Sequence, residues 1–367
     1  MGEPMDSFEI GCVKFGKFSA LKKNEFFDPE IISELAKRIA MYKTEGGESV
    51  RDVLVCTPDT AKFEPFSPEH KRRILAAVDA LRFAFIFENT VRRIACKDRN
   101  AWHIHSELFE LISYQICLGD ESVSIKSRFL SSYWPSFEDV TFHCPTSISL
   151  PPLPPSIRIA LALGAAFSSF ASDGRHLQYN RMIQALEWFR LANSGADMLS
   201  EAAKVVMMTT AIESLLGLKP GQSGGKEFCQ SIRDRITSSS LCSKTITFKN
   251  RRGKPYEIPA HALAAWSSET LYKLRCDAVH GDTVEPERFF FDTGRTILVL
   301  DVAIVVFGEL ILNDLFNAKM LGNILAPAYP KTSREQLSRT LFESQFRLQK
   351  LHEKLGWKDA TPDIPDK

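Results

Sequence analysis

Arg275 and His280 are the two residues whose types and spacing are best suited to chemistry. They lie in the run LYKLRCDAVHGD, which predicts a helix that ends at Gly281, because glycine is favoured just after a helix. The negative helix end and Asp277, three residues before His280, would both favour a protonated imidazole. A fixed guanidinium beside a titratable imidazole is suited to phosphodiester chemistry.

The spacing of this pair limits how it can work. On an ideal helix, residues five apart point roughly 140° away from each other. Arg275 and His280 can therefore meet one ligand only if the last helical turn loosens, or if a second copy of the helix faces the first.

Glu213 is a further candidate, because it is a carboxylate on the mostly apolar segment AIESLL. Such a residue commonly pairs with an arginine, and either Arg275 or Arg181 would serve. We expect Glu213 to orient the arginine, with a direct catalytic role as the alternative. Asp277, Glu213 and Tyr272 are the residues that we group with the pair as supporting residues.

Three segments in this order resemble the HEPN superfamily, in particular its Apea-like domains, over residues of about 173–318. They are QALEWFRLA at 184–192, MMTTAIESLLG at 207–217 and LYKLRCDAVHGD at 271–282. The resemblance implies an all-helical bundle and a metal-independent endoribonuclease of phage defence or toxin systems. It implies that Arg275 and His280 are the catalytic pair, that the RNA 2′-hydroxyl attacks the adjacent phosphate, and that the site forms in a homodimer.

A concentrated basic segment supports RNA as the partner. Between Lys219 and Lys254 the chain has nine basic and two acidic residues. We expect a long loop around one short helix between Leu218 and Glu257. Its flexible end could follow a phosphate backbone, whereas Phe248 and Tyr256 could stack on bases. A solvated loop that is basic by chance is the alternative. The RNA-binding candidates are Lys249, Arg251, Arg252 and Lys254.

Overall composition limits the class of protein. Lys and Arg number 46 and Asp and Glu number 45, which gives a net charge of +1 and excludes a wholly basic coat. The most apolar stretches, 159–171 and 296–312, are too short or carry Asp301 and Glu309, and predict buried helices rather than membrane spans. The start has no apolar leader and the eight cysteines have no framework, which favours a cytoplasmic protein.

The pattern along the 367 residues predicts an α+β protein. We expect a mixed α/β region at 1–150 that senses a trigger, contacts a regulatory partner or selects the substrate, then a proline-rich linker at 151–155. An Apea-like helical domain at 156–320 and a C-terminal helix with a frayed tail at 321–367 follow. Ser67 and Pro68 mark a helix start, and further helices are predicted at 156–172, 175–193, 197–217, 226–239, 258–280, 286–317 and 333–355.

Two classes of function remain in view. The first is a ribonuclease that uses no metal or other cofactor, and the second is a non-catalytic HEPN module for dimerisation or for binding RNA or protein. Cys276 and the neutral net charge favour the second, because active members often have Asn, Asp or His after the arginine. A metal hydrolase that uses His103 and His105 would lack the carboxylate or cysteine cluster that such sites need.

Overall fold

The computed structural model divides the chain into two compact units, 1–78 with 106–154 and 79–105 with 155–367. The second unit includes 79–105, which sequence analysis had grouped with the first region. The residues that the structure describes are 7–18, 29–40, 42–43, 54–58, 67–96, 106, 113–115, 123–126, 131–134, 142–143, 155–195, 199–218, 224–236, 241–249, 253–320 and 347–357. The protein is α+β, as predicted.

The first unit contains short strands and one amphipathic helix, α2 (Pro29–Ala40). Strands β1 (Ser7–Ile10), β2 (Val13–Lys17) and β4 (Leu54–Pro58) form an antiparallel sheet in the order β1-β2-β4. A second antiparallel sheet joins β5 (Ser113–Gln115), β6 (Val123–Lys126) and β7 (Ser131–Trp134), and β3 (Tyr42–Lys43) pairs in parallel with β8 (Phe142–His143). The described part of this unit thus combines strands and a helix, in agreement with the α+β prediction.

Helix α3 (Pro68–Cys96) begins where the sequence predicts. The Ser67 hydroxyl accepts a hydrogen bond of 3.1 Å from the backbone N–H of His70, and Pro68 occupies the first helical position. This satisfies one of the backbone donors that a helix start leaves unpaired.

The second unit is built from helices whose bounds follow the predicted ones at most ends. Of the proline-rich stretch, only Pro155 is described, as the first residue of α4. Gly217 ends α6 with a positive φ of 72°, a conformation that glycine adopts without strain. The longer helices are α4 (Pro155–Ser172), α5 (His176–Ala192), α6 (Glu201–Leu216), α7 (Gly225–Arg235), α10 (Val299–Asn317) and the C-terminal α13 (Arg347–Lys354).

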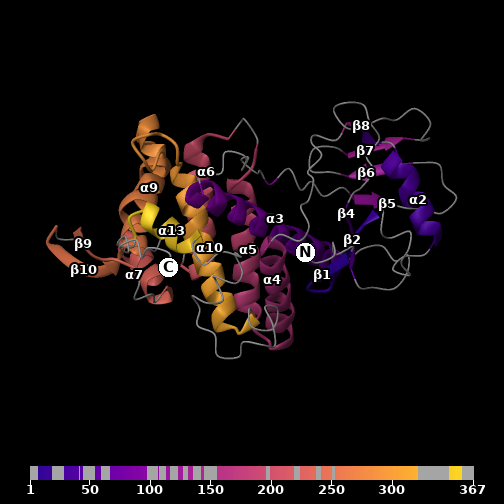
Figure 1. Ribbon diagram of the computed structural model, residues 1–367, viewed down its shortest axis with the longest axis horizontal. Coiled ribbons are helices and arrows are strands. Elements are labelled where there is room, and N and C mark those ends of the chain that lie inside the picture. The colour runs from indigo at the N-terminus through magenta and orange to yellow at the C-terminus, as the bar shows by residue number, and fades with distance from the viewer. Residues whose placement is uncertain are drawn as a thin grey trace, which may run out of the picture. The chain divides into compact units, whose positions relative to one another are not determined.

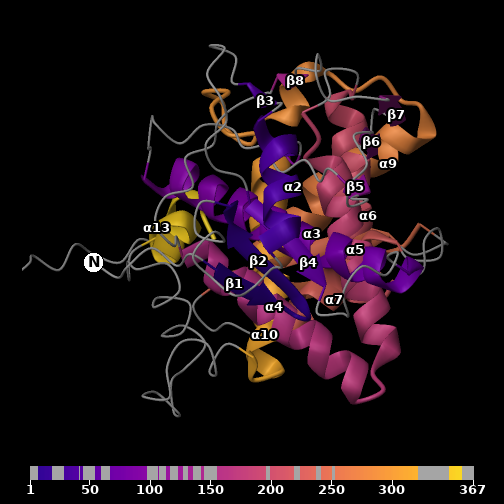
Figure 2. The ribbon, with the colours of Figure 1, turned by 90° about the vertical axis from the view of Figure 1, so that its right-hand side faces the viewer.

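A cluster of four phenylalanines joins α3, α5 and α10 in the core of this unit. Phe83 stacks on Phe87 and meets the edges of Phe189 and Phe307, with ring centroids 5.2 to 5.6 Å apart. Helix α10 is buried on nearly all sides, which explains its continuous apolar sequence. α4, α5, α6 and α10 run alongside one another in both ribbon views (Figures 1 and 2). The prediction of buried helices is confirmed for 159–171 and for 299–312, whereas 296–298 precede α10.

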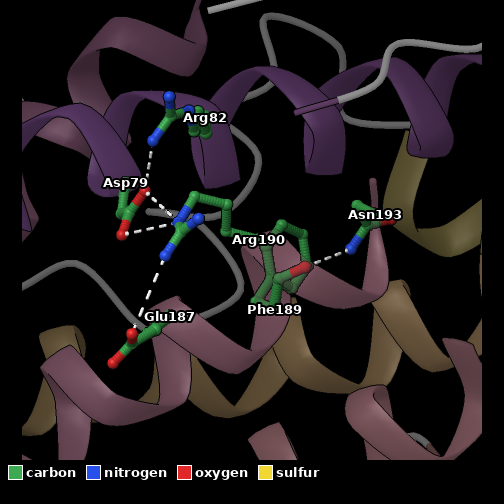
Figure 3. A network of polar contacts seen from close by, with 6 residues as sticks. All are labelled: Asp79, Arg82, Glu187, Phe189, Arg190 and Asn193. Atoms are coloured by element: carbon green, nitrogen blue, oxygen red, sulfur yellow. Dashed lines mark hydrogen bonds and ion pairs between the residues drawn. The ribbon is translucent and has the colours of Figure 1, made fainter. Parts of the chain in front are cut away.

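Two buried carboxylates of the helical unit, Asp79 and Asp301, are paired with arginines. Asp79 of α3 lies 2.6 Å from Arg82 and 3.1 Å from Arg190 of α5, and Arg190 also lies 3.8 Å from the exposed Glu187 (Figure 3). In α10, the buried Asp301 forms an ion pair with Arg93. A buried charge is stable only when it is compensated in this way.

The segment expected to be a loop around one short helix contains, besides α7, a β-hairpin. β9 (Ser243–Lys249) pairs antiparallel with β10 (Pro255–His261), and Pro255 and Pro259 lie opposite Lys249 and Thr245. The predicted start of the next helix at 258 is therefore wrong, because 258–261 belong to β10. In β10, buried Ile258 and Ala260 alternate with exposed neighbours, which is the period of a strand.

Two other predicted helices differ from the structure. Residues 286–317 form a short 3₁₀ turn, η3 (Pro286–Phe289), and then α10, with an irregular loop between them. In that loop the Asp292 carboxylate accepts hydrogen bonds from the N–H groups of Thr296 and Ile297, which stabilises a turn. α13 covers only the end of the predicted 333–355, and residues 333–346 and the tail 358–367 lie outside the described residues.

The C-terminal helix is anchored by Trp357, which is buried just after it. The Trp357 carbonyl accepts a 2.8 Å hydrogen bond from the N–H of Cys242, and its ring lies 6.2 Å from that of Trp266. A search of the described residues finds no helix long and apolar enough to cross a membrane.

Candidate functional site

The helix that carries Arg275 and His280 changes its winding along its length. It begins as α8 (Ala262–Trp266), continues as a π-helical turn, η2 (Ser267–Tyr272), and ends as α9 (Lys273–His280). The His261 imidazole accepts a 3.1 Å hydrogen bond from the N–H of Ala264 and so caps the start. π-helical turns are rare and often lie at functional sites.

The end of α9 has the predicted geometry. Gly281 has a φ of 79°, and the N–H groups of Gly281 and Asp282 both donate to the Asp277 carbonyl. This arrangement closes the helix and leaves His280 in its last turn. The prediction that Gly281 follows the helix end is confirmed.

Arg275 and His280 lie on different sides of α9. Both belong to the regular α-helical stretch, so the roughly 140° between them is kept. The Arg275 side chain is only 17% exposed, whereas His280 is exposed and its imidazole has no hydrogen bond or ion pair to another described residue. One chain therefore does not bring the two side chains to one ligand.

Glu213 of α6 is the carboxylate that faces Arg275. Its Oε2 lies 4.0 Å from Arg275 Nη2, and within the described part of the chain neither carboxylate oxygen accepts a hydrogen bond. Burial raises the pKa of Glu213, and the charge of Arg275 acts in the opposite direction. The sequence allowed Arg275 or Arg181 as the partner. The structure pairs Glu213 with Arg275, and the Arg181 guanidinium packs against Gly217 instead.

Tyr272 completes this cluster, one helical turn before Arg275. The Arg275 guanidinium carbon lies 5.6 Å from the centroid of the Tyr272 ring. Burial, and secondly the negative charge of Glu213, raise the pKa of Tyr272, so its phenol stays protonated. Glu213 and Tyr272 thus both lie beside the Arg275 guanidinium.

Asp277 does not join this cluster. Its carboxylate accepts a 2.7 Å hydrogen bond from Arg288 of η3, and no hydrogen bond between Asp277 and His280 is present among the described residues. The expectation that Asp277 would accept a hydrogen bond from His280 is corrected here. The local reason is that the chain turns back after Gly281 and places Arg288 beside α9.

Two of the four RNA-binding candidates lie at the tip of the β9–β10 hairpin. Lys249 and Lys254 are exposed at its tip, whereas Arg251 and Arg252 lie outside the described residues. Phe248 and Tyr256 are directly opposite in the register and their rings stack with centroids 6.1 Å apart.

Lys226 of α7 is a member of this surface that sequence reasoning did not single out. Its Nζ lies 4.9 Å from the centroid of the Tyr256 ring. The sequence counted Lys226 only as one basic residue among nine. The contact joins residues thirty positions apart through the folding of the hairpin onto α7, and no local pattern signals it.

No group of three His, Cys, Asp or Glu residues that could hold a metal ion is present in the part of the chain that the structure describes. His103 and His105 lie outside that part.

Comparison of the chain with family models, with curated proteins and with solved structures gives no match. The resemblance to Apea-like HEPN domains therefore remains a prediction from the three sequence segments.

Proposed function

We propose that the chain is a metal-independent endoribonuclease of HEPN type whose active site forms between two copies of α9. Arg275 of one copy and His280 of the other would contact the same phosphate. The observation that carries the proposal is the contrast between the two side chains. His280 is exposed in the last helical turn, whereas Arg275 lies on another face beside Glu213 and Tyr272.

The reaction would be an internal transfer at phosphorus. The RNA 2′-oxygen attacks the adjacent phosphate, the 5′-oxygen leaves, and the products are a 2′,3′-cyclic phosphate and a 5′-hydroxyl. His280 would take the 2′-hydroxyl proton or give a proton to the leaving oxygen. Arg275 would stabilise the charge that develops on the phosphate oxygens, which is a task for a group already in position.

The position of Arg275 supports this role. A buried carboxylate lies 4.0 Å from Arg275 Nη2, and no hydrogen bond from the guanidinium to another described residue is present. Nε is buried, so an incoming phosphate would have to bind the terminal nitrogens, in the part of the side chain that is 17% exposed.

The proposal includes a place where the nuclease activity is controlled. A cytoplasmic defence or toxin nuclease needs control, and the first unit, with residues 1–78 and 106–154, is where we place the contact with a trigger or regulatory partner.

A non-catalytic module that dimerises or binds RNA or protein is the second candidate. It is favoured by the low exposure of Arg275 and by Val279, an apolar residue 51% exposed beside His280 that could be covered by a partner chain. This candidate predicts binding or dimerisation without cleavage.

The test is cleavage of single-stranded RNA by purified protein in EDTA, beside Arg275→Ala and His280→Ala. His176→Ala, which removes another exposed helical histidine, is the matched control and should cleave as the parent protein does. We expect both site variants to lose at least about a hundredfold in rate. Cleavage that survives both substitutions, or that EDTA abolishes, would contradict the proposal, and binding with no cleavage would favour the second candidate.

A further inference from the structure

The hairpin carries two aromatic side chains on one of its two faces and lysines at its tip. Phe248 and Tyr256 are a cross-strand pair near its tip, and Lys226 of α7 reaches over the Tyr256 ring. Lys254 follows the tip on the approach to β10, and Lys249 ends β9. We call Lys226, Phe248 and Tyr256, with Lys249 and Lys254 at the tip, the hairpin platform. In the ribbon, β9 and β10 extend away from the helices beside α7 (Figure 1).

The acidic residue of the hairpin lies on the other face. Glu257 is opposite Thr247, and side chains alternate between faces along each strand, so Glu257 points away from Phe248 and Tyr256. By the same alternation Lys249 lies on the face of Glu257, so the face without a strand carboxylate carries the two aromatic rings and the ammonium group of Lys226. That combination is complementary to a polyanion with flat apolar groups.

The base of the hairpin is fixed to the helical unit. Ile246, Ile258 and Ala260 are buried on the same face as the aromatic pair. Arg233 of α7 donates a 3.0 Å hydrogen bond to the Pro259 carbonyl. A Cβ on Gly225 would lie 3.6 Å from Phe248 Cε1, so the ring packs against the start of α7. The rings are thus held in place before any ligand arrives, which reduces the entropy lost on binding.

We infer that the hairpin platform binds single-stranded RNA, with bases against the Phe248 and Tyr256 rings and phosphates beside the lysines. A base has an exposed π-face only when it is unpaired, since in a duplex the faces are covered by neighbouring pairs. The rings select for a single strand, and the lysines contribute binding that is independent of sequence and sensitive to salt. This inference rests on the proposed function for one point, which is that the bound single strand is RNA.

The test is binding of a fluorescent 2′-O-methyl oligouridylate of twelve nucleotides to the full chain, followed by anisotropy. This probe has no 2′-hydroxyl to attack, so binding is measured apart from cleavage. We expect Tyr256→Leu to weaken binding about tenfold and Tyr256→Phe to leave it within about twofold, because the ring and not the hydroxyl makes the contact. Lys226→Gln should weaken binding and lower the slope of log affinity against log salt by about 0.7.

Matched controls separate the platform from general charge and from folding. Lys71→Gln makes the same charge change at an exposed position of the first unit and should bind as the parent protein does. Thermal unfolding of each variant shows whether the hairpin variants remain folded, and Lys226→Gln keeps the test decisive if Tyr256→Leu is unstable. A duplex of the same length should bind at least about tenfold more weakly than the single strand.

The outcomes distinguish this inference from the nuclease proposal. Equal affinities of the parent protein, Tyr256→Leu and Lys226→Gln would overturn the inference and leave the aromatic pair as a contact that stabilises the hairpin. No binding of the probe, or equal binding of the duplex, would overturn it as well. Binding as expected together with no cleavage of unmodified RNA would support the platform and contradict the nuclease proposal. Cleavage of RNA by a protein whose hairpin variants bind the probe as the parent does would support the nuclease proposal and contradict the platform.

Discussion

The Arg275 guanidinium lies 4.0 Å from the carboxylate of Glu213, whose side chain is only 2% exposed. The distance is longer than a hydrogen bond, and among the described residues neither oxygen of Glu213 has a hydrogen-bond donor. A carboxylate in such surroundings is destabilised in its charged form, and only the nearby positive charge compensates for it. The pair therefore positions Arg275 at the expense of stability.

Glu213→Gln should change how stability depends on pH. Burial raises the pKa of Glu213 above its usual 4.5 in the folded chain. The folded state then holds a proton that the unfolded state has lost, so the parent protein should lose stability as the pH rises above about 4.5. Glutamine does not titrate, and we expect the stability of the parent protein relative to Glu213→Gln to fall over this interval. Chemical unfolding of both proteins from pH 4 to pH 8 measures it.

The control for this experiment is Glu201→Gln, which changes a more exposed carboxylate in the first turn of the same helix. The same measurements on this variant show the effect of replacing a glutamate of α6 that is not the partner of Arg275. If the stability of the parent protein relative to Glu213→Gln rises with pH instead, the charge of Arg275 outweighs the effect of burial.

The composite site predicts that two inactive variants complement each other. In a mixture of Arg275→Ala and His280→Ala chains, a mixed dimer contains one site with an intact Arg275 from one chain and an intact His280 from the other. With random exchange, roughly a quarter of the parent activity should return, because half of the dimers carry one working site of two. RNA cleavage before and after mixing measures this return. A mixture that stays inactive although the chains exchange would place both residues of a site in one chain.

The network around Asp79 predicts a large loss of stability on removal of its charge. In Asp79→Asn, the guanidinium groups of Arg82 and Arg190 lose the buried carboxylate between them (Figure 3). We expect the free energy of unfolding to fall by about 3 kcal/mol, as for other buried pairs that lose one partner. Urea unfolding gives the value. Glu187→Gln affects the same Arg190 from an exposed position and should cost less than about 0.5 kcal/mol.

A side chain added at Gly308 should clash with its neighbour in the core. A Cβ at this position of α10 would overlap the ring of Phe87 of α3. Gly308→Ala should destabilise the chain by about 1–3 kcal/mol, more than alanine gains in helix propensity. In a Phe87→Leu background the same substitution should be better tolerated, since the ring is absent. Equal losses in the two backgrounds, measured in a double-mutant cycle, would show that the contact is not the cause.

Most helices could be predicted from the sequence because their signals are local. Ser67 and Pro68 mark the start of α3, and Gly217 and Gly281 mark the ends of α6 and α9. Long apolar runs predicted α4 and α10 because a helix buried on all sides needs no polar face. These features depend on residues within one or two turns of each other.

The hairpin and the loop before α10 were missed because tertiary packing overrides the local pattern there. The segment 243–261 is rich in polar residues, and only the burial of Ile246, Ile258 and Ala260 against the helices reveals its strand period. In the candidate site, Glu213 was placed correctly beside an arginine, since a lone carboxylate on an apolar helix needs a counter-charge. Arg288, the partner of Asp277, comes from a turn eleven residues later whose path the sequence does not indicate.

The two prolines of β10 restrict how copies of this chain can associate. A proline within a sheet stands where its missing N–H points away from the neighbouring strand. The outer side of β10 therefore lacks backbone donors at Pro255 and Pro259, and another strand cannot add there with a full ladder. Thr245 and Thr247 of β9 keep their N–H groups, so growth of this hairpin into an intermolecular sheet is favoured on its β9 side.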